Sequence, residues 1–321
     1  MKSVMVTGVG GMVGQGILRN IRSLDRKIEL HGTDIRRISA GNHLCDSVHV
    51  LPYAYDPGYI PAVAGLVRDL GITLIIPSTD YESYFLARHA SELGATVATS
   101  PAEVIAVCLD KFKTFESFRA YGSPFADSAL PSSYQPRHAR VVVKPREGRG
   151  SRNIHLDPQR PESFDDTFVV QEYLDGPELT TTFYVTRDGN LHGFITLARE
   201  LEAGSTSRCE VTKHHDLEIR RLIEQMLEHF EFRGSCNLQS RVTTAGVVPF
   251  EVNCRLSGTN SIRSQLGFPD VAYTIDEYLY DGLPEAPRVR GGCAIRVTHD
   301  VIYPESTLDE ICNRHDHFRI F

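Results

Sequence analysis

The chain has 321 residues, of which 41% are hydrophobic and 23% charged, and its net charge is −7 at pH 7. This composition fits a globular protein of two or three domains, and it excludes the basic surface that non-specific nucleic-acid binding needs. The 7 cysteines are odd in number and never form Cys-X-X-Cys. Neither a disulfide framework nor a zinc site is therefore expected, and the expected compartment is a reducing cytoplasm. No run of roughly 20 apolar residues occurs, so we expect no membrane-spanning helix.

Strands and helices alternate over the first third of the chain. Short apolar segments that predict strands lie at residues 3–8, 27–34, 72–80 and 95–100. Segments with apolar residues at helical spacing lie between them, at 12–24, 60–71 and 81–94. This alternation predicts a parallel sheet that is covered by helices on both faces.

A glycine-rich loop joins the first strand to the first helix. It reads "VTGVGGMVGQG" over residues 6–16 and contains Gly8, Gly10, Gly11 and Gly14. Such a loop places backbone N–H groups and a helix N-terminus beside an anion. Asp34 ends the second predicted strand, where a dinucleotide site has its ribose-binding acid. An NAD(P)-dependent oxidoreductase is one interpretation, and glycines that only pack a helix against a strand are the other.

The pattern changes at about Asp110. A predicted helix over residues 110–122 is followed by a linker over 123–138 that is rich in Pro and Ser. Predicted strands and hairpins make up most of the remaining chain, with a turn at 188–190 and an amphipathic helix over 215–232. This order of elements predicts an α+β architecture after the parallel first third.

The predicted hairpin over residues 235–253 carries the most informative side chains. With its turn near Ala245, Gln239 lies opposite Glu251, and Asn253 points to the same face as Glu251. Directly opposed side chains have Cβ atoms about 5 Å apart, so three oxygen-bearing side chains would converge there. A hard divalent cation prefers oxygen ligands, one or two of them from carboxylates, and substrate phosphates would complete its coordination shell. Arg255 would follow on that face and neutralise an anion. The alternative is a solvated polar hairpin.

Two further segments contain cations that suit phosphate groups. Lys144 ends an apolar strand, and the loop after it contains Gly148 and Gly150 between arginines. Glycines let backbone N–H groups approach phosphate oxygens, whereas an exposed basic hairpin is the simpler interpretation. Lys111 stands at a helix start, where the helix dipole opposes a cation, and this suggests an anion nearby.

A third segment could recognise a nucleoside. The apolar strand "TFVV" runs into Gln171, Glu172, Tyr173 and Leu174. An extended backbone with apolar neighbours can bind an adenine, and Glu178 could then accept hydrogen bonds from ribose hydroxyls. The alternative is an edge strand with an acid that faces solvent.

The ordered motifs "DK", "VVVKP" with "REGRGSR", "VVQEYLDGPE", "NLQ" and "FEVNCRLSG" resemble the ATP-grasp superfamily. The likeness is greatest to its carbamoyl-phosphate-synthase-like branch, most of whose members are carboxylate–amine ligases. It covers nearly the whole chain. The resemblance implies a mixed α/β and α+β fold. A Rossmann-like pre-ATP-grasp domain would span residues 1–109, a subdomain with the flap and adenine hinge 110–175, and a subdomain with the metal site 176–321.

The resemblance also implies a chemistry: an ATP- and Mg²⁺-dependent ligase, with Mn²⁺ as a substitute, that joins a small carboxylate to an amine through an acyl phosphate. The implied ATP-binding residues are Lys111, Lys144, Gly148, Gly150, Ser151, Gln171, Glu172, Tyr173, Leu174 and Glu178. The implied metal ligands are Gln239, Glu251 and Asn253, although many relatives have an acid in place of Gln239. The residues expected to stabilise the transferred phosphoryl group are Arg255, Lys144 and Arg199.

The substrate side is expected to include Gly10, Asp80 and Glu82, with Arg263 as a clamp for a substrate carboxylate. No nucleic acid or membrane is an expected partner, and homodimers are common in the family. Two competing interpretations stay open. One is the NAD(P)-dependent oxidoreductase, which leaves the motifs of residues 140–255 unexplained. The other is a non-catalytic ATP-binding protein of the same fold.

Overall fold

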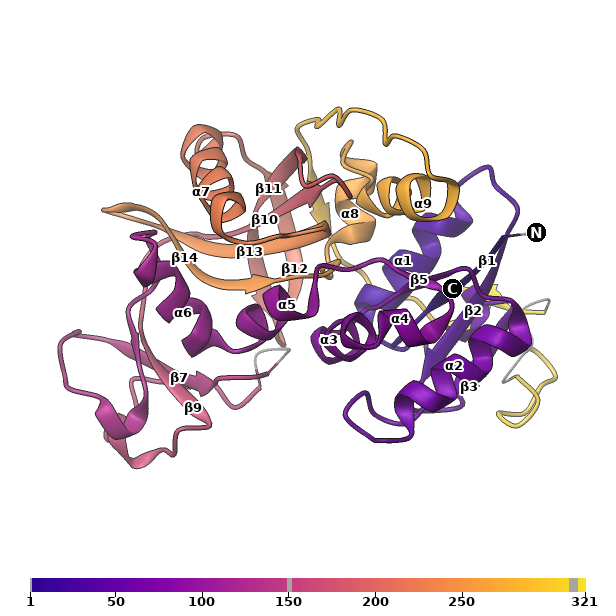
Figure 1. Cartoon of the computed structure of the whole chain (residues 1–321), viewed down its shortest axis with the longest axis horizontal. Coiled ribbons are helices and arrows are strands. Elements are labelled where there is room, and N and C mark those ends of the chain that lie inside the picture. Colours follow the sequence, from indigo (N-terminus) through magenta and orange to yellow (C-terminus); the bar gives the residue numbers. More distant parts are fainter. Residues whose placement is uncertain (1, 149–151, 312–316) are drawn as a thin grey trace.

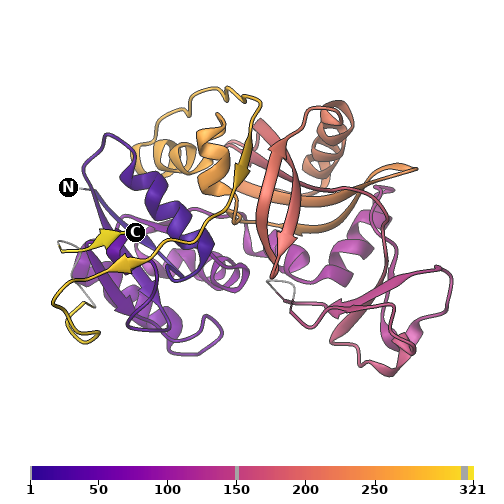
Figure 2. The ribbon, with the colours of Figure 1, turned by 180° about the vertical axis from the view of Figure 1, so that it is seen from behind.

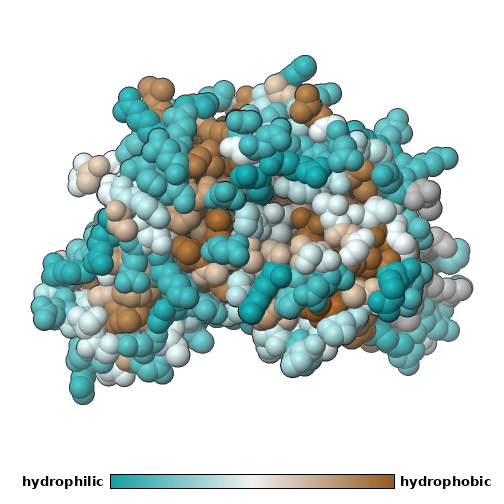
Figure 3. All heavy atoms as spheres, viewed as in Figure 1, coloured by the Kyte–Doolittle hydropathy of each residue, from teal (hydrophilic) through white to brown (hydrophobic). Residues whose placement is uncertain are grey.

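Three larger β-sheets follow one another along the molecule, and a two-stranded sheet near the C-terminus is the fourth, in a computed structural model that describes residues 2–148, 152–311 and 317–321. The parallel sheet lies at one end, a six-stranded antiparallel sheet in the middle, and a four-stranded antiparallel sheet at the other end (Figures 1 and 2). Hydrophilic residues predominate on the face shown in Figure 3, with smaller groups of hydrophobic residues between them. The predicted combination of α/β and α+β parts is confirmed.

The parallel sheet has the strand order β3-β2-β1-β4-β5. Its strands are β1 (Lys2–Val6), β2 (Ile28–Asp34), β3 (Ser47–Val50), β4 (Leu74–Ile76) and β5 (Thr96–Val97), and its helices are α1 (Met12–Arg22), α2 (Tyr59–Leu70), α3 (Asp80–Arg88) and α4 (Ala90–Leu93). Alternate residues of β1 face opposite sides. Val4 packs in the core with Ile17 of α1, and Met5 packs in the core with Val63 of α2. Strand β3 was not predicted, because its sequence SVHV is short and half polar.

The four-stranded sheet has the order β6-β9-β7-β8. Its strands are β6 (Ser128–Ala129), β7 (Val141–Pro145), β8 (His155–Leu156) and β9 (Phe168–Glu172), preceded by α5 (Ala102–Leu109) and α6 (Lys111–Ala120). Asp110 caps α6, because its carboxylate accepts hydrogen bonds from the N–H groups of Phe112 (2.9 Å) and Lys113 (3.3 Å). Gly122, with φ +69°, follows this helix, as its sequence predicts.

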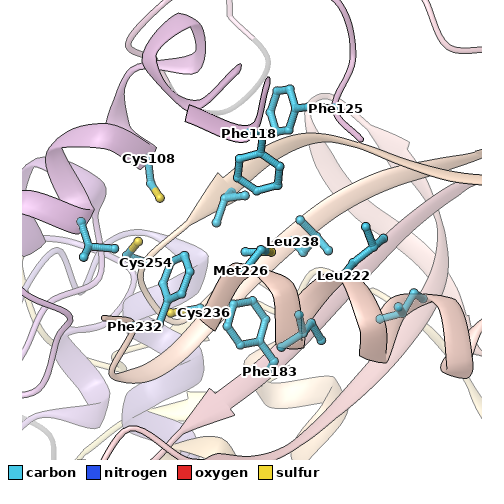
Figure 4. Close-up of a cluster of buried hydrophobic side chains, with 14 of the residues drawn as sticks. Cys108, Phe118, Phe125, Phe183, Leu222, Met226, Phe232, Cys236, Leu238 and Cys254 are labelled. Atoms are coloured by element: carbon cyan, nitrogen blue, oxygen red, sulfur yellow. The ribbon is translucent and has the colours of Figure 1, made fainter. Parts of the chain in front are cut away.

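The six-stranded sheet has the order β14-β13-β10-β11-β12-β15. Its elements are β10 (Glu178–Val185), β11 (Leu191–Glu202), β12 (Ser205–Val211), α7 (Asp216–His229), β13 (Gly234–Thr243), β14 (Gly246–Asn253) and β15 (Cys293–Ile295). The predicted register of the β13–β14 hairpin is confirmed: Gln239 pairs with Glu251, and a bulge follows. Helix α7 covers one face, where Met226 packs against Phe183 and Leu238 (Figure 4).

The last part of the chain returns to the parallel sheet. It contains α8 (Asn260–Gln265), α9 (Asp270–Tyr280), β16 (Val301–Ile302) and β17 (Arg319–Ile320). Three short 3-10 helices complete the described elements, at Asn42–Leu44, Pro131–Ser133 and Pro161–Ser163. Helices α8 and α9 pack against α1, and Leu256 and Val271 share the hydrophobic core of β1. Part of the predicted third unit, 176–321, therefore shares its core with the first. No helix in the described ranges is long and apolar enough to cross a membrane.

Candidate active site

A cavity of about 820 Å³ is lined by residues of all three sheets. The parallel sheet contributes the segments that follow its strands, and the two antiparallel sheets contribute side chains from strands β7, β9, β11, β13 and β14. The predicted site residues that line it are Asp80, Glu82, Lys111, Lys144, Gly148, Gln171, Glu172, Tyr173, Leu174, Glu178, Arg199, Gln239, Glu251, Asn253 and Arg255. Gly150 and Ser151 lie outside the described residues.

The β13–β14 hairpin brings two amides and one carboxylate together. Both the Gln239 side-chain amide (3.4 Å) and the Asn253 side-chain amide (3.2 Å) donate a hydrogen bond to Glu251 Oε1. The amide oxygens accept bonds from arginines instead: Gln239 Oε1 from Arg199 (2.8 Å) and Asn253 Oδ1 from Arg255 (3.3 Å). The three side chains thus converge on the carboxylate, as their register predicts.

This trio suits a magnesium ion whose other ligands are phosphate oxygens. Among the residues that the structure describes, no group of three His, Cys, Asp or Glu could hold a metal. Any metal at the trio would have one carboxylate ligand, Glu251, and rotation of the two side-chain amides would turn their oxygens towards the same point. Mg²⁺ is commonly bound by one or two carboxylates, with phosphates and water completing its shell.

Two lysines flank Glu251. Lys111 Nζ lies 3.9 Å from Glu251 Oε2 and also donates to the backbone oxygen of Gly148 (3.4 Å). Lys144 is 6% exposed, and its Nζ lies 5.2 Å from the centre of the Phe250 ring. Burial lowers the pKa of Lys144 to about 8, against the attraction of Glu251. Burial alone would raise the pKa of Glu251, but Lys111 and Lys144 outweigh it and lower that pKa. The cluster has an excess of positive charge, which suits a polyphosphate.

The predicted ribose acid is held by two arginines. Arg199 lies 2.7 Å from Glu178 Oε1 and also donates to Gln239, so it links the nucleotide and metal residues. Arg241, which the sequence did not single out, donates to Glu178 Oε2 at 3.4 Å. Arg241 pairs directly with Glu178 on the neighbouring strand. A predicted strand register that places an arginine opposite an acid could have identified this residue from the sequence.

Arg255 connects the hairpin to the parallel sheet. Its Nη2 donates to Asp80 Oδ2 at 2.8 Å, across 175 residues of sequence. Its Nε is buried, and no hydrogen-bond partner for it lies within the described ranges. Asp80 begins α3, whose capping residue Thr79 donates to Glu82 Oε2 at 2.7 Å. The two predicted substrate-side acids are therefore both engaged, one with Arg255 and one in a helix cap.

The side chains of the predicted adenine hinge support the strand. The Gln171 amide donates to Ser128 Oγ (3.1 Å), and Glu172 Oε1 accepts from the N–H of Asp127 (2.8 Å). The Tyr173 N–H donates to the backbone of the neighbouring strand segment at 3.0 Å. Contact with a nucleobase would therefore have to come from the main chain and from apolar side chains that line the cavity.

Arg146 does not serve the phosphate role that the basic loop suggested. Its guanidinium donates to both carboxylate oxygens of Asp110, at 3.1 and 2.6 Å, and to the backbone oxygen of Asp166. The ion pair fixes the end of β7 to the start of α6. Arg152 lines the cavity, whereas Arg149 lies outside the described residues.

The prediction that Arg263 binds a substrate carboxylate is not supported. Arg263 is fully buried and does not line the cavity. Its Nε and Nη2 donate to the two oxygens of Asp270 at 3.0 and 2.6 Å, and its Nη1 donates to Ser257 (2.8 Å) and Thr259 (2.9 Å). A partner carboxylate seven residues further along the chain thus takes the place that a substrate was expected to fill. Arg263 instead supports the loop that lines the cavity.

The glycine loop has most of its N–H groups engaged internally. The N–H of Gly10 donates to Asp34 Oδ2 at 2.8 Å. The N–H of Gly11 donates to the oxygen of Gly8 (3.0 Å), and the N–H of Val9 to the backbone of β2 (3.1 Å). These amides and the Asp34 carboxylate are the groups that a dinucleotide would need, so the loop geometry weighs against an NAD(P) site. Gly10 itself does not line the cavity, although Gly8 and Gly11 do.

Arg296 lines the cavity and was missed in the sequence. It follows β15 and donates to the backbone oxygen of Gly258 (2.7 Å), with Met12 Sδ at 3.0 Å from its Nη1. Within the described ranges its buried Nε has no partner and it forms no ion pair. Burial lowers its pKa, and the nearby Arg19 lowers it further against an opposing effect of Cys209. The one feature of the sequence that could have indicated this residue is its position as a lone arginine in the apolar segment "GCAIRV".

The overall fold is similar to that of several solved enzymes. An N5-carboxyaminoimidazole synthetase from Staphylococcus aureus complexed with ADP superposes with a TM-score of 0.73 at 12% identity, over 90% of this chain and 80% of that one. The biotin carboxylase domain of the Hydrogenobacter thermophilus 2-oxoglutarate carboxylase, solved with MgADP, gives 0.70 at 15% identity, over 91% and 73%. An L-amino acid ligase from Bacillus licheniformis gives 0.69 at 14% identity, over 87% and 74%.

The predicted resemblance to ATP-grasp proteins is confirmed at the level of the fold. Within this class, residues 164–313 match the model of a family described as "ATP-grasp in the biosynthetic pathway with Ter operon". The match covers just under half of the chain and includes the whole β13–β14 hairpin. No curated protein sequence matches the chain significantly.

Proposed function

We propose that the chain is an ATP-dependent carboxylate–amine ligase that works through an acyl phosphate. The observation that carries the proposal is the cluster at the β13–β14 hairpin, where two buried ammonium groups flank one carboxylate and two amides in the shared cavity. Such a set neutralises a polyphosphate and leaves oxygen ligands for its metal. The role of each individual residue is part of the proposal.

The nucleotide would lie across the two antiparallel sheets. Its base would contact the segment that ends β9, its ribose would face Glu178, and its phosphates would approach Lys111 and Lys144. Binding would have to displace Arg199 or Arg241 from Glu178, because both arginines contact that carboxylate in this structure. The freed guanidinium of Arg199 would then be available to a phosphate oxygen.

The reaction would have two steps. A carboxylate oxygen of the substrate attacks the γ-phosphorus of ATP, and the bond from that phosphorus to the bridging oxygen breaks to release ADP. The nitrogen of an amine then attacks the carbonyl carbon of the acyl phosphate, the bond from carbon to the phosphate oxygen breaks, and the amine loses a proton as phosphate leaves. Phosphoryl transfer asks the protein chiefly for positioning and charge neutralisation.

Two arginines and one ion would supply the remaining charge stabilisation. Mg²⁺ held by Gln239, Glu251 and Asn253 would neutralise the phosphate oxygens. Arg255, which has an unpartnered buried Nε beside the hairpin, would face the transferred phosphoryl group. Arg296, which pairs with no carboxylate in the described part of the chain, would face the substrate carboxylate. The flap that the family resemblance implies, residues 146–152, of which 149–151 lie outside the described residues, would exclude water from the acyl phosphate.

Small carboxylates and amines, amino acids among them, are the proposed substrates. One solved neighbour is named an L-amino acid ligase, and this supports a screen of amino-acid pairs. The test is ADP release with Mg²⁺ and ATP over such pairs, repeated with hydroxylamine in place of the amine. We expect release that depends on the carboxylate, together with a hydroxamate from trapped acyl phosphate.

Glu251→Gln is the matched inactive control for this screen, because it keeps the size of the side chain and removes its charge. A parallel thermal-shift measurement would compare Mg-ATP with NAD and NADP. Stabilisation by NAD or NADP and none by Mg-ATP would contradict the proposal, and so would ADP release that no carboxylate accelerates.

A further inference from the structure

Three tyrosines line the end of the cavity that the parallel-sheet domain forms. Tyr53 and Tyr55 lie in the loop between β3 and α2, and Tyr81 lies in the first turn of α3. The rings of Tyr53 and Tyr55 are stacked, with centroids 5.3 Å apart and planes inclined by 5°. Tyr81 meets Tyr55 edge-on at 6.3 Å and 80°. The rings form a continuous aromatic wall, which we call the tyrosine wall.

The tyrosine wall is open to a ligand. Tyr53 is 47% exposed and Tyr55 is 61% exposed, whereas Tyr59, a few residues later, is buried in the core at 1%. Within the described part of the chain, Tyr53 has Tyr55 as its single stacking partner. Exposed rings that line a cavity retain apolar faces that a ligand could cover.

Tyr81 is held in place from the opposite side of the cavity. Its hydroxyl donates to Glu147 Oε2 at 3.0 Å, and Glu147 follows β7 of the four-stranded sheet. The Tyr81 end of the wall is therefore held by this bond. A fixed aromatic surface favours a flat ligand, because little ordering entropy is lost on binding.

The tyrosine wall is separate from the predicted adenine position. Tyr53 and Tyr55 belong to the parallel-sheet domain, whereas Gln171 lies in β9 of the four-stranded sheet, at the other end of the molecule, and Leu174 follows that strand (Figure 1). A ring at the wall would consequently belong to the substrate that accepts or donates the acyl group.

The charges around the wall favour a ring over an ammonium group. Tyrosine faces also attract cations, and a cation site would need a free acid nearby. The nearby acids are engaged within the protein: both oxygens of Asp34 accept backbone N–H bonds, Asp80 pairs with Arg255, Glu82 accepts from Thr79, and Glu147 accepts from Tyr81. The cation Arg296 lines the same cavity without a carboxylate partner among the described residues. A neutral flat group joined to a carboxylate suits this arrangement.

We propose that the tyrosine wall selects a substrate that carries an aromatic or heteroaromatic ring, which stacks on an outer face of the Tyr53–Tyr55 pair. The proposal rests on the ligase function above for the identity of the site, and it adds the chemical class of one substrate.

The test uses the absence of tryptophan from this chain. The fluorescence of L-tryptophan, tryptamine or indole-3-acetate can be followed during titration with protein, in the presence of Mg²⁺ and a non-hydrolysable ATP analogue. We expect saturable binding of at least one of the three probes. The double variant Tyr53→Leu/Tyr55→Leu should weaken it about tenfold, because the aromatic stacking face is lost.

Two controls separate stacking from other effects. Tyr53→Phe/Tyr55→Phe keeps both rings and should retain affinity, and Tyr280→Leu removes a tyrosine of similar exposure (41%) that does not line the cavity. Affinity for the ATP analogue should stay unchanged in all variants. Competition by L-phenylalanine should exceed that by L-cyclohexylalanine, whose ring is of similar size but is neither flat nor aromatic.

Three results would overturn the proposal: no saturable binding of any probe, equal affinity in the double leucine variant, or equal competition by the two amino acids. The measurement needs no turnover. If a probe binds as expected but no carboxylate accelerates ADP release, the ligase function fails while the ring site stands.

Discussion

Lys144 should make ATP binding depend on pH above neutrality. Burial lowers the pKa of this lysine from its ordinary 10.5 to about 8 in the nucleotide-free protein. The lysine is therefore largely neutral above pH 8, and the bound triphosphate would restore its charge. Binding then takes up a proton, so that affinity must fall as pH rises. If the bound pKa returns to 10.5, affinity falls tenfold per pH unit above 8, or about 300-fold by pH 10.5.

The same shift has a defined sign for stability. Between pH 8 and 10.5 the unfolded chain binds more protons at this lysine than the folded chain does. The contribution of Lys144 to the free energy of unfolding therefore rises with pH across that window. Below pH 8 both states are protonated, and the burial of the charge costs its full amount.

Calorimetric titration with Mg²⁺ and a non-hydrolysable ATP analogue measures both effects. Titrations at pH 7, 8 and 9 in buffers of different ionisation enthalpy should give uptake of about half a proton at pH 8. Lys144→Arg is the control, since arginine keeps its charge throughout. Its affinity should vary little with pH. Equal pH dependence in both proteins, or affinity that is constant from pH 7 to 9 in the wild type, would refute the role given to Lys144.

Three substitutions test other parts of the site. Glu251→Gln should lower ADP release at least about 100-fold, because it removes the only carboxylate of the trio, while circular dichroism shows an unchanged fold; retained turnover would remove Glu251 from the metal site. Arg263→Ala should lower the free energy of unfolding by about 3–5 kcal/mol in urea denaturation, because Asp270 is left buried without its partner; a stable variant with weakened substrate binding would restore Arg263 as a clamp. Arg296→Met should raise the KM of the carboxylate and leave the KM of ATP unchanged, measured by steady-state ADP release; a selective effect on ATP would move Arg296 to the nucleotide.

The β13–β14 hairpin could be predicted from the sequence because its register depends only on the turn and on the alternation of side chains along each strand. A turn near Ala245 and a side-chain period of two place Gln239, Glu251 and Asn253 on one face without any knowledge of the rest of the fold. The alternation of the first third predicted the parallel sheet for the same reason. An anion near Lys111 was expected from the helix dipole, and Glu251 is that anion.

Contacts between distant segments could not be predicted in this way. Whether an arginine is available to a ligand depends on the acid that reaches it after folding. Arg146 is engaged by Asp110 from an earlier helix, and Arg263 by Asp270 inside the core. Arg296 lies in a segment with little periodicity, so only the fold places it in the cavity.

The position of the C-terminal helices is a further feature that required the structure. Gly16 of α1 lets Asn260 approach closely, because a Cβ at that glycine would lie 2.0 Å from Asn260 Oδ1. The Asn260 amide donates to the oxygen of Val13 at 3.0 Å. The sequence pattern places this glycine at the end of a phosphate loop, whereas in the fold it packs helix against helix.

The central claim is that Gln239, Glu251 and Asn253 hold one Mg²⁺ against the phosphates of ATP. A crystal structure with a non-hydrolysable ATP analogue and Mg²⁺ tests it most directly. We expect one ion with Glu251 and at least one rotated amide oxygen at about 2.1 Å, and with phosphate oxygens completing an octahedron. Phosphates that lie away from Lys144, or an ion that contacts none of the three side chains, would contradict this claim.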